Sequence, residues 1–66
     1  MNPITIGKRL KELRGERNRG AVAKSLNISL SALAMYERGE RIPRDEVKKR
    51  FSELYGKSVQ EIFYDE

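Results

Sequence analysis

The amino-acid sequence predicts an all-α fold with five short helices in a single domain, residues 1–66. Apolar residues recur at helical spacing along the chain, and no segment alternates apolar and polar residues as a half-buried strand would. Glycine, asparagine, serine and proline, which commonly begin or end helices, separate the periodic segments. Sixty-six residues allow one small hydrophobic core, and the absence of cysteine means that no disulfide supports it.

The first two helices are predicted to meet at a short turn. Thr5 is the expected N-cap of the first helix, because its hydroxyl can accept a hydrogen bond from an amide of the first turn, and Gly15 is expected to end it. The second helix is expected to begin after Asn18 and to end at Asn27, since asparagine tolerates the left-handed conformation that often closes a helix. The apolar residues of the two helices are Ile6, Leu10 and Leu13, then Val22, Ala23 and Leu26.

The third helix is expected to begin after Ser29, to run over residues 30–38 and to end at Gly39. Leu33 and Tyr36 are three residues apart and form its expected inner face. The other side chains of this helix then point away from the core. They are Leu30, Ser31, Ala34, Met35 and Arg38.

The last two helices are predicted from a proline and a capping box. Pro43 precedes the fourth helix, and Asp45 and Glu46 occupy its first turn, where the helix dipole favours acidic side chains. Gly56 is expected to end this helix. Residues 58–61 have the Ser-x-x-Glu pattern of a capping box, which predicts a short fifth helix. The apolar residues of these helices are Val47, Phe51, Leu54 and Tyr55, then Val59, Ile62 and Phe63.

The charge of the chain is positive and concentrated in its N-terminal part. Fourteen Lys and Arg against ten Asp and Glu give a net charge of +4. Residues 1–44 carry ten basic and four acidic side chains, whereas residues 45–66 carry four basic and six acidic ones. Charge alone leaves two interpretations open, an ordinary solvated surface or a basic face that binds phosphate groups.

The composition argues against an enzyme. With neither Cys nor His, the chain lacks a thiol nucleophile, an imidazole acid or base and the usual zinc ligands, so we expect no catalytic residue and no metal. The carboxylates lie among basic residues at helical spacing, which is typical of surface ion pairs. No run approaches the ~18 apolar residues that span a bilayer, and no signal peptide is recognisable. We therefore expect a cytoplasmic binding protein without a membrane partner.

Residues 22–39 carry the strongest functional signal. A short helix, a tight turn at residues 27–29 and a second helix follow one another there. Helices joined by so short a turn cross steeply, as in a helix-turn-helix unit. In such a unit the second helix can enter the major groove of DNA while the first lies across the phosphate backbone.

Several segments, taken together, resemble a known family. They are Ile6-Gly-Lys-Arg-Leu-Lys-Glu-Leu-Arg14, Val22-Ala-Lys-Ser-Leu-Asn-Ile-Ser29, Leu33, Tyr36-Glu-Arg-Gly39, Pro43 and Ser58-Val-Gln-Glu-Ile-Phe63. In order and spacing they resemble the Cro and phage-repressor family of helix-turn-helix transcription regulators, also called the xenobiotic-response-element type. The resemblance implies a lambda-repressor-like domain that binds double-stranded operator DNA as a homodimer without a cofactor.

The resemblance also implies roles for individual side chains. Arg14 and Glu37 match an arginine and a glutamate that pair with each other and orient the helices. The positions that would face the bases are Leu30, Ser31, Ala34 and Met35. The positions that would contact phosphates or the minor groove are Arg19, Lys24, Arg38, Arg41 and Arg44.

Three interpretations stay open for the apolar side chains among the base-facing positions. Leu30, Ala34 and Met35 suit thymine methyl groups, while Ser31 is the one side chain there that can hydrogen-bond to a base edge. The same apolar patch suits a partner regulator protein, because methionine adapts to varied surfaces. Leu30 or Met35 could also simply pack against the body of the domain.

The C-terminal helix is the expected dimer surface. Ile62, Phe63 and Tyr64 would supply the contacts. The competing assignment puts Ile62 and Phe63 wholly inside the core of one monomer, and both assignments could hold in part.

Overall fold

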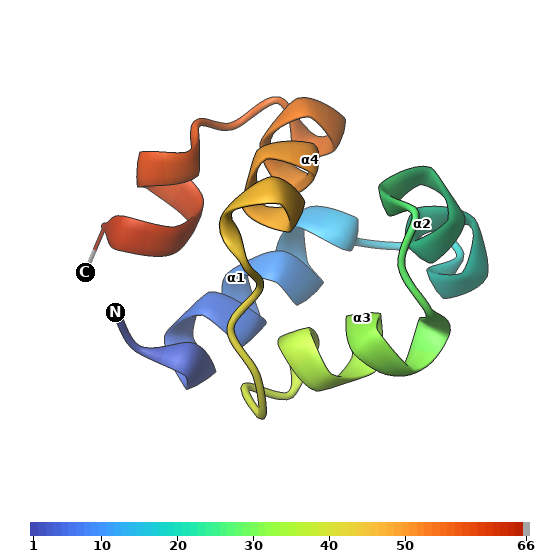
Figure 1. Ribbon diagram of the computed structural model, residues 1–66, viewed down its shortest axis with the longest axis horizontal. Coiled ribbons are helices and arrows are strands. Elements are labelled where there is room, and N and C mark those ends of the chain that lie inside the picture. The colour runs from blue at the N-terminus through green and yellow to red at the C-terminus, as the bar shows by residue number, and fades with distance from the viewer. Residues whose placement is uncertain (66) are drawn as a thin grey trace.

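The computed structural model describes residues 1–65, which form four α-helices and one π-helical turn. The helices are α1 (Pro3–Arg14), α2 (Arg19–Leu26), α3 (Leu30–Glu37) and α4 (Asp45–Tyr55), and the turn is η1 (Gln60–Tyr64). Figure 1 shows α1 in the middle of the molecule, with α3 on one side of it and α4 on the other. The described part of the chain contains no strand, so the predicted all-α fold with five helical segments is confirmed.

Helix α1 begins earlier than the sequence pattern indicates. The side-chain oxygen of Asn2 accepts hydrogen bonds from the amides of Ile4 and Thr5 at 3.0 and 3.2 Å. Pro3 occupies the first helical position, where its missing N–H costs nothing. The prediction of Thr5 as the N-cap is therefore wrong, because the Asn2-Pro3 pair starts the helix before Thr5 is reached.

Three further predicted caps are found where the sequence indicates, whereas α3 ends at Glu37 with Arg38 as its C-cap, one residue before the expected Gly39. Asn18 accepts from the amide of Ala21, and Ser29 accepts from the amide of Ala32, each at 3.0 Å. Asn27 ends α2 in the left-handed conformation, with a φ of 56°. These local hydrogen bonds set the ends of α2 and α3, and so the length of the turn between them.

The capping box before the last segment is also confirmed. The Ser58 amide donates to the Glu61 carboxylate at 2.9 Å, and the Glu61 amide donates to the Ser58 hydroxyl at 3.0 Å. The bond from the Ser58 amide is the main cause that lowers the pKa of Glu61. The segment that follows is a single π-helical turn rather than the expected short α-helix.

The core takes side chains from every helical segment. The ring of Phe51 in α4 contacts Tyr55, Phe63 and Tyr36, with centroid separations of 5.8, 6.1 and 6.2 Å. Aromatic contacts of this kind stabilise a core beyond the area that they bury. The buried apolar residues are Ile6, Leu10, Val22, Ala23, Leu26, Leu33, Tyr36, Val47, Phe51, Ile62 and Phe63.

Two of the three residues expected at a dimer surface lie in this core. Ile62 and Phe63 are each 1% exposed, whereas Tyr64 is 42% exposed. The dimer expectation is corrected for Ile62 and Phe63, because side chains buried this deeply leave no surface for a partner. The competing assignment of these two residues to the monomer core describes them better.

Gly7 allows α1 and α3 to approach closely. A Cβ atom at Gly7 would lie 2.5 Å from the carbonyl oxygen of Glu37 and 2.9 Å from that of Tyr36. Only a residue without a side chain fits between the two backbones at this distance. The C-terminal end of α3 is thereby fixed against α1, which sets the orientation of α3 on the body of the domain.

Candidate nucleic-acid interface

Helices α2 and α3 form a compact helix-turn-helix. The turn between them contains residues 27–29, and the Ile28 amide closes it by donating to the carbonyl of Ala23 at 3.0 Å. Leu26 and Leu33, one from each helix, are fully buried at the junction. Helix α3 lies along one edge of the molecule (Figure 1). This geometry leaves the side of α3 that faces away from α1 open to solvent.

The outward face of α3 carries the four residues expected to face DNA bases. Leu30 is 54% exposed, Ser31 is exposed, and Ala34 and Met35 are partly exposed. The structure therefore rules out full burial of Leu30 against the domain body. An exposed leucine at the start of a solvent-facing helix, beside further apolar side chains, is typical of a contact surface.

The five cations expected at DNA phosphates or in the minor groove are all exposed. They come from α2, from the end of α3 and from the loop that follows α3. They are Arg19, Lys24, Arg38, Arg41 and Arg44.

Two of these cations line a polar groove of about 610 Å³. Arg41 and Arg44 lie along it with Ser29 of the helix-turn-helix turn, so the groove joins that turn to the loop before α4. Arg50 of α4 also lines the groove and was not predicted from the sequence. Its guanidinium donates to the carbonyl of Leu26 at 3.2 Å, which makes it a positioning residue for the end of α2.

Two further cations line a separate hollow beside the C-terminal part of α3. Arg19 and Arg38 line a hollow of about 140 Å³ together with Lys11 of α1, another residue that sequence reasoning missed. Lys11 lies on the polar face of α1, and nothing in its local sequence distinguishes it from the neighbouring Lys8. The guanidinium of Arg38 is paired with the carboxylate of Glu40, at 2.9 and 3.2 Å.

Arg14 and Glu37 form the predicted ion pair. Nε of Arg14 is 2.8 Å from one carboxylate oxygen, and Nη2 is 3.1 Å from the other. The side chains are 9% and 6% exposed. The hydrogen bond to Glu37 is the main cause that raises the pKa of Arg14, so the guanidinium stays charged.

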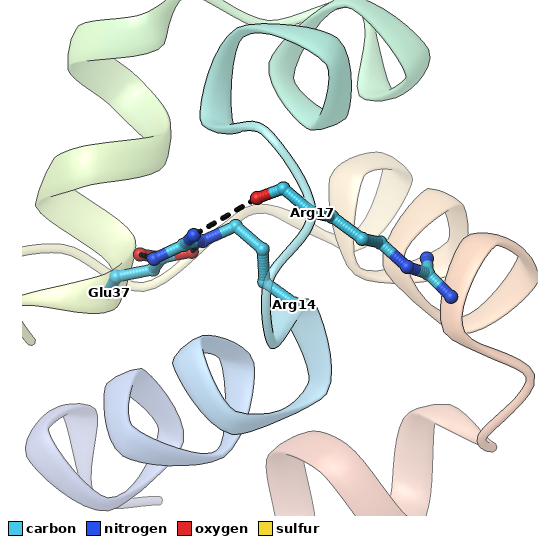
Figure 2. A network of polar contacts seen from close by, with 3 residues as sticks. All are labelled: Arg14, Arg17 and Glu37. Atoms are coloured by element: carbon cyan, nitrogen blue, oxygen red, sulfur yellow. Dashed lines mark hydrogen bonds and ion pairs between the residues drawn. The ribbon is translucent and has the colours of Figure 1, made fainter.

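Arg14 also fixes the turn that precedes α2. Its Nη1 donates to the backbone carbonyl of Arg17 at 3.2 Å, while the Arg17 side chain points away towards α4 (Figure 2). There the Arg17 guanidinium lies 5.3 Å from the centre of the Tyr55 ring. One buried side chain thus connects α1, the turn before α2 and the end of α3.

Tyr64 is held at the surface by a buried lysine. Nζ of Lys48 donates to the Tyr64 hydroxyl at 2.9 Å and lies 4.8 Å from the centre of its ring. Lys48 itself is buried, and its nearest carboxylate oxygen, on Asp45, is 3.7 Å away. The Tyr64 ring covers an interior charge and still presents an exposed side to solvent.

A helix-turn-helix family model matches residues 10–62. The match includes α2, α3 and α4 and most of the remaining chain. The chain belongs to the Cro/C1-type helix-turn-helix family. The recognised resemblance is thus confirmed, and this helix-turn-helix protein is a DNA-binding transcriptional regulator rather than an enzyme.

A solved structure has the same fold as this helix-turn-helix protein. The crystal structure of the clp gene regulator ClgR from C. glutamicum superposes with a TM-score of 0.79, covering 94% of this chain and 83% of that chain. The two sequences are 20% identical, so this likeness concerns the fold alone. A search of characterised proteins found no significant match.

Within residues 1–65, no group of three or more acidic, His or Cys side chains is arranged to hold a metal ion. In the same range, no helix is long and apolar enough to cross a membrane.

Proposed function

We propose that this protein is a repressor that binds operator DNA in the cytoplasm as a homodimer, with α3 in the major groove. The observation that carries the proposal is the outward face of α3, where Leu30 and Ser31 are exposed, together with the exposed cations of α2 and of the segment that follows α3. Residues 1–66 act as one DNA-binding domain in this proposal. The orientation of α3 comes from the Gly7 contact and from the Arg14–Glu37 pair.

The side chains of α3 favour a particular kind of base recognition. The hydroxyl of Ser31 can donate to or accept from a base edge, whereas Leu30, Ala34 and Met35 can contact thymine methyl groups. Methyl contacts distinguish few sequences, so the shape and deformability of the operator would contribute much of the specificity. We therefore propose an A·T-rich half-site.

The exposed cations fix the domain on the DNA backbone in this proposal. Arg19, Lys24 and Arg38 would contact phosphates on either side of the major groove. Arg41 and Arg44, which share the groove beside the helix-turn-helix turn, would contact phosphates or enter the minor groove.

Selection of bound sequences from a random duplex pool at a defined salt concentration tests the proposal. We expect enrichment of a palindrome whose half-sites are separated by about one helical turn, ~10 base pairs. We also expect the logarithm of the binding constant to fall by about 0.9 per contacted phosphate for each tenfold rise in salt. Recovery of the unselected pool at low salt would show that the protein does not bind DNA specifically.

The exposed apolar side chains of α3 favour one alternative function. Leu30 and the partly exposed Met35 could bind a partner regulator protein instead of DNA. The Leu30→Glu and Met35→Glu variants distinguish the two functions. The alternative would be supported if these variants no longer bind a purified partner protein that the parent binds, and if the parent protein does not bind DNA.

A further inference from the structure

We propose that Glu40 limits the affinity of this protein for DNA by occupying Arg38. Arg38 belongs to a site for one backbone phosphate that also contains Lys11 and Arg19. This inference rests on the proposed DNA binding, and it assigns roles to Lys11 and Glu40 that the helix-turn-helix arrangement alone does not.

The three cations come from three different helical segments and meet at one hollow. Lys11 lies on α1, Arg19 is the first residue of α2, and Arg38 directly follows α3. The hollow is about 140 Å³, and Ala34 of the proposed DNA-contacting face also lines it. A phosphate that entered it while α3 lay in the major groove would meet positive charge from all three segments.

The carboxylate that borders this hollow is already neutralised. Both oxygens of Glu37 accept hydrogen bonds from the buried guanidinium of Arg14. Neither Lys11 nor Arg19 forms an ion pair with any residue in the described range 1–65. Two of the three cations are thus free to meet an anion, and only Arg38 already has an anionic partner.

Glu40 binds Arg38 in the way a phosphate would. Nε and Nη2 of Arg38 each donate to one carboxylate oxygen of Glu40, at 2.9 and 3.2 Å. Arginine uses the same two-pronged arrangement for phosphate oxygens, so Glu40 and a phosphate compete for the same donors. The Arg38 and Glu40 side chains are 61% and 53% exposed, which makes their pair weak enough to exchange.

The backbone of the turn does not depend on this ion pair. The Gly39 amide donates to the carbonyl of Tyr36 at 3.2 Å, and the Glu40 amide donates to that of Met35 at 2.9 Å. Neutralising Glu40 therefore leaves these backbone bonds in place, and a change in DNA binding does not come from a change in the fold of the turn.

A double-mutant cycle on the full chain tests the proposal. The probe is a fluorescein-labelled duplex of about 30 base pairs, and binding is followed by anisotropy between about 50 and 200 mM salt. We expect Glu40→Gln to tighten binding by about two- to fivefold, the range of an exposed ion pair. In the Arg38→Gln background, the same change should give only the small gain that comes from removing a negative charge, because there is no guanidinium to release.

A matched control separates this effect from general repulsion between DNA and acidic side chains. Glu16 is exposed in the turn before α2 and forms no ion pair within residues 1–65. Glu16→Gln removes the same charge without freeing an arginine, so its gain should be smaller than that of Glu40→Gln. Equal gains from Glu40→Gln and Glu16→Gln, or a Glu40→Gln gain that is undiminished without Arg38, overturn the proposal.

Lys11 is tested by the salt dependence of binding. Lys11→Ala should weaken binding to all sequences and reduce the salt slope by about 0.9, the contribution of one phosphate contact. Lys57→Ala, in the connection between α4 and η1, is the matched control and should leave the slope unchanged. Identical behaviour of the two variants excludes Lys11 from the phosphate site. If the parent protein binds no duplex at low salt, the proposed function itself fails.

Discussion

At the scale of single residues, the Arg14–Glu37 pair is the main buried electrostatic feature of the molecule. Both side chains are almost inaccessible, and the guanidinium makes three hydrogen bonds to two separate segments. Removal of one member of such a pair leaves an uncompensated interior charge, which costs far more than the net value of the pair. The pair therefore enforces the fit between α1, α3 and the start of α2.

We expect Glu37→Ala to lower the free energy of unfolding by about 3 kcal/mol, because Arg14 would remain buried without its carboxylate. Urea denaturation followed by circular dichroism measures this change. The double variant Arg14→Met with Glu37→Leu is the control, and it should recover most of the loss since no charge stays buried. A loss below about 1 kcal/mol for Glu37→Ala would show that the site is readily hydrated.

Replacement of Tyr55, in contrast to replacement of Glu37, is expected to raise the free energy of unfolding. Its hydroxyl is buried and has no hydrogen-bond partner in the described part of the chain. Replacing an unsatisfied polar group with an apolar one is near neutral or stabilising, so Tyr55→Phe should change stability by no more than about 1 kcal/mol and in the favourable direction. Thermal unfolding of the two proteins at neutral pH measures the difference. A destabilised variant would indicate that the hydroxyl has a partner after all.

Tyr55 also makes stability depend on alkaline pH. Burial is the main cause that raises the pKa of Tyr55 in the folded protein. The folded state therefore holds this proton more tightly than the unfolded state, and its contribution is complete below the ordinary tyrosine pKa. That contribution is lost as pH rises through the raised value. The alkaline loss of stability should be smaller in Tyr55→Phe.

At the scale of helices, the sequence predicts elements and caps better than it predicts contacts between them. Asn18, Ser29 and Asn27 act within a few residues of their own positions, so their roles can be predicted from local chemistry alone. Thr5 was misassigned because Asn2 with Pro3 forms a stronger start. The sequence leaves Ile62 and Phe63 ambiguous, since their burial depends on segments distant in sequence, such as Phe51, against which Phe63 packs.

In the candidate site too, the positions on one helix can be predicted from the sequence, whereas contacts between helices cannot. The outward positions of α3 could be predicted because helical spacing places Leu33 and Tyr36 inside and leaves Leu30 and Ser31 outside. The grouping of cations could not be predicted, because Lys11 and Arg38 line the same hollow only as a result of the packing of α1 on α3. The same contact depends on Gly7, whose importance no local pattern indicates.

Gly7→Ala is therefore the test for the packing of α1 on α3. The added Cβ would lie 2.5 Å from the carbonyl oxygen of Glu37, which forces two backbones apart. Overpacking of this kind typically costs about 1–3 kcal/mol, although alanine favours helix more than glycine does. We expect lower stability and weaker DNA binding together, measured by urea denaturation and anisotropy. Thr5→Ala is the control, because Thr5 is an exposed residue of the same helix.

At the scale of the whole molecule, the proposed DNA-binding face and the exposed side of Tyr64 belong to different parts of the fold. Helix α3 lies along one edge, whereas η1 packs against α1 and α4 (Figure 1). A homodimer on a palindrome needs a contact between copies that leaves both α3 helices free. With Ile62 and Phe63 inside the core, Tyr64 is the member of the predicted dimer surface that can supply such a contact.

The Tyr64→Glu variant tests this assignment without exposing the interior. A carboxylate at position 64 can still accept a hydrogen bond from Lys48, so the buried ammonium keeps a partner and the monomer should remain folded. Binding to one isolated half-site should be unchanged, whereas binding to two half-sites about 10 base pairs apart should weaken about tenfold, the typical loss of an aromatic contact at an interface. Anisotropy on the two duplexes separates these effects. Equal weakening on both would assign Tyr64 to the DNA-binding face instead, and no weakening on either would exclude it from the dimer contact.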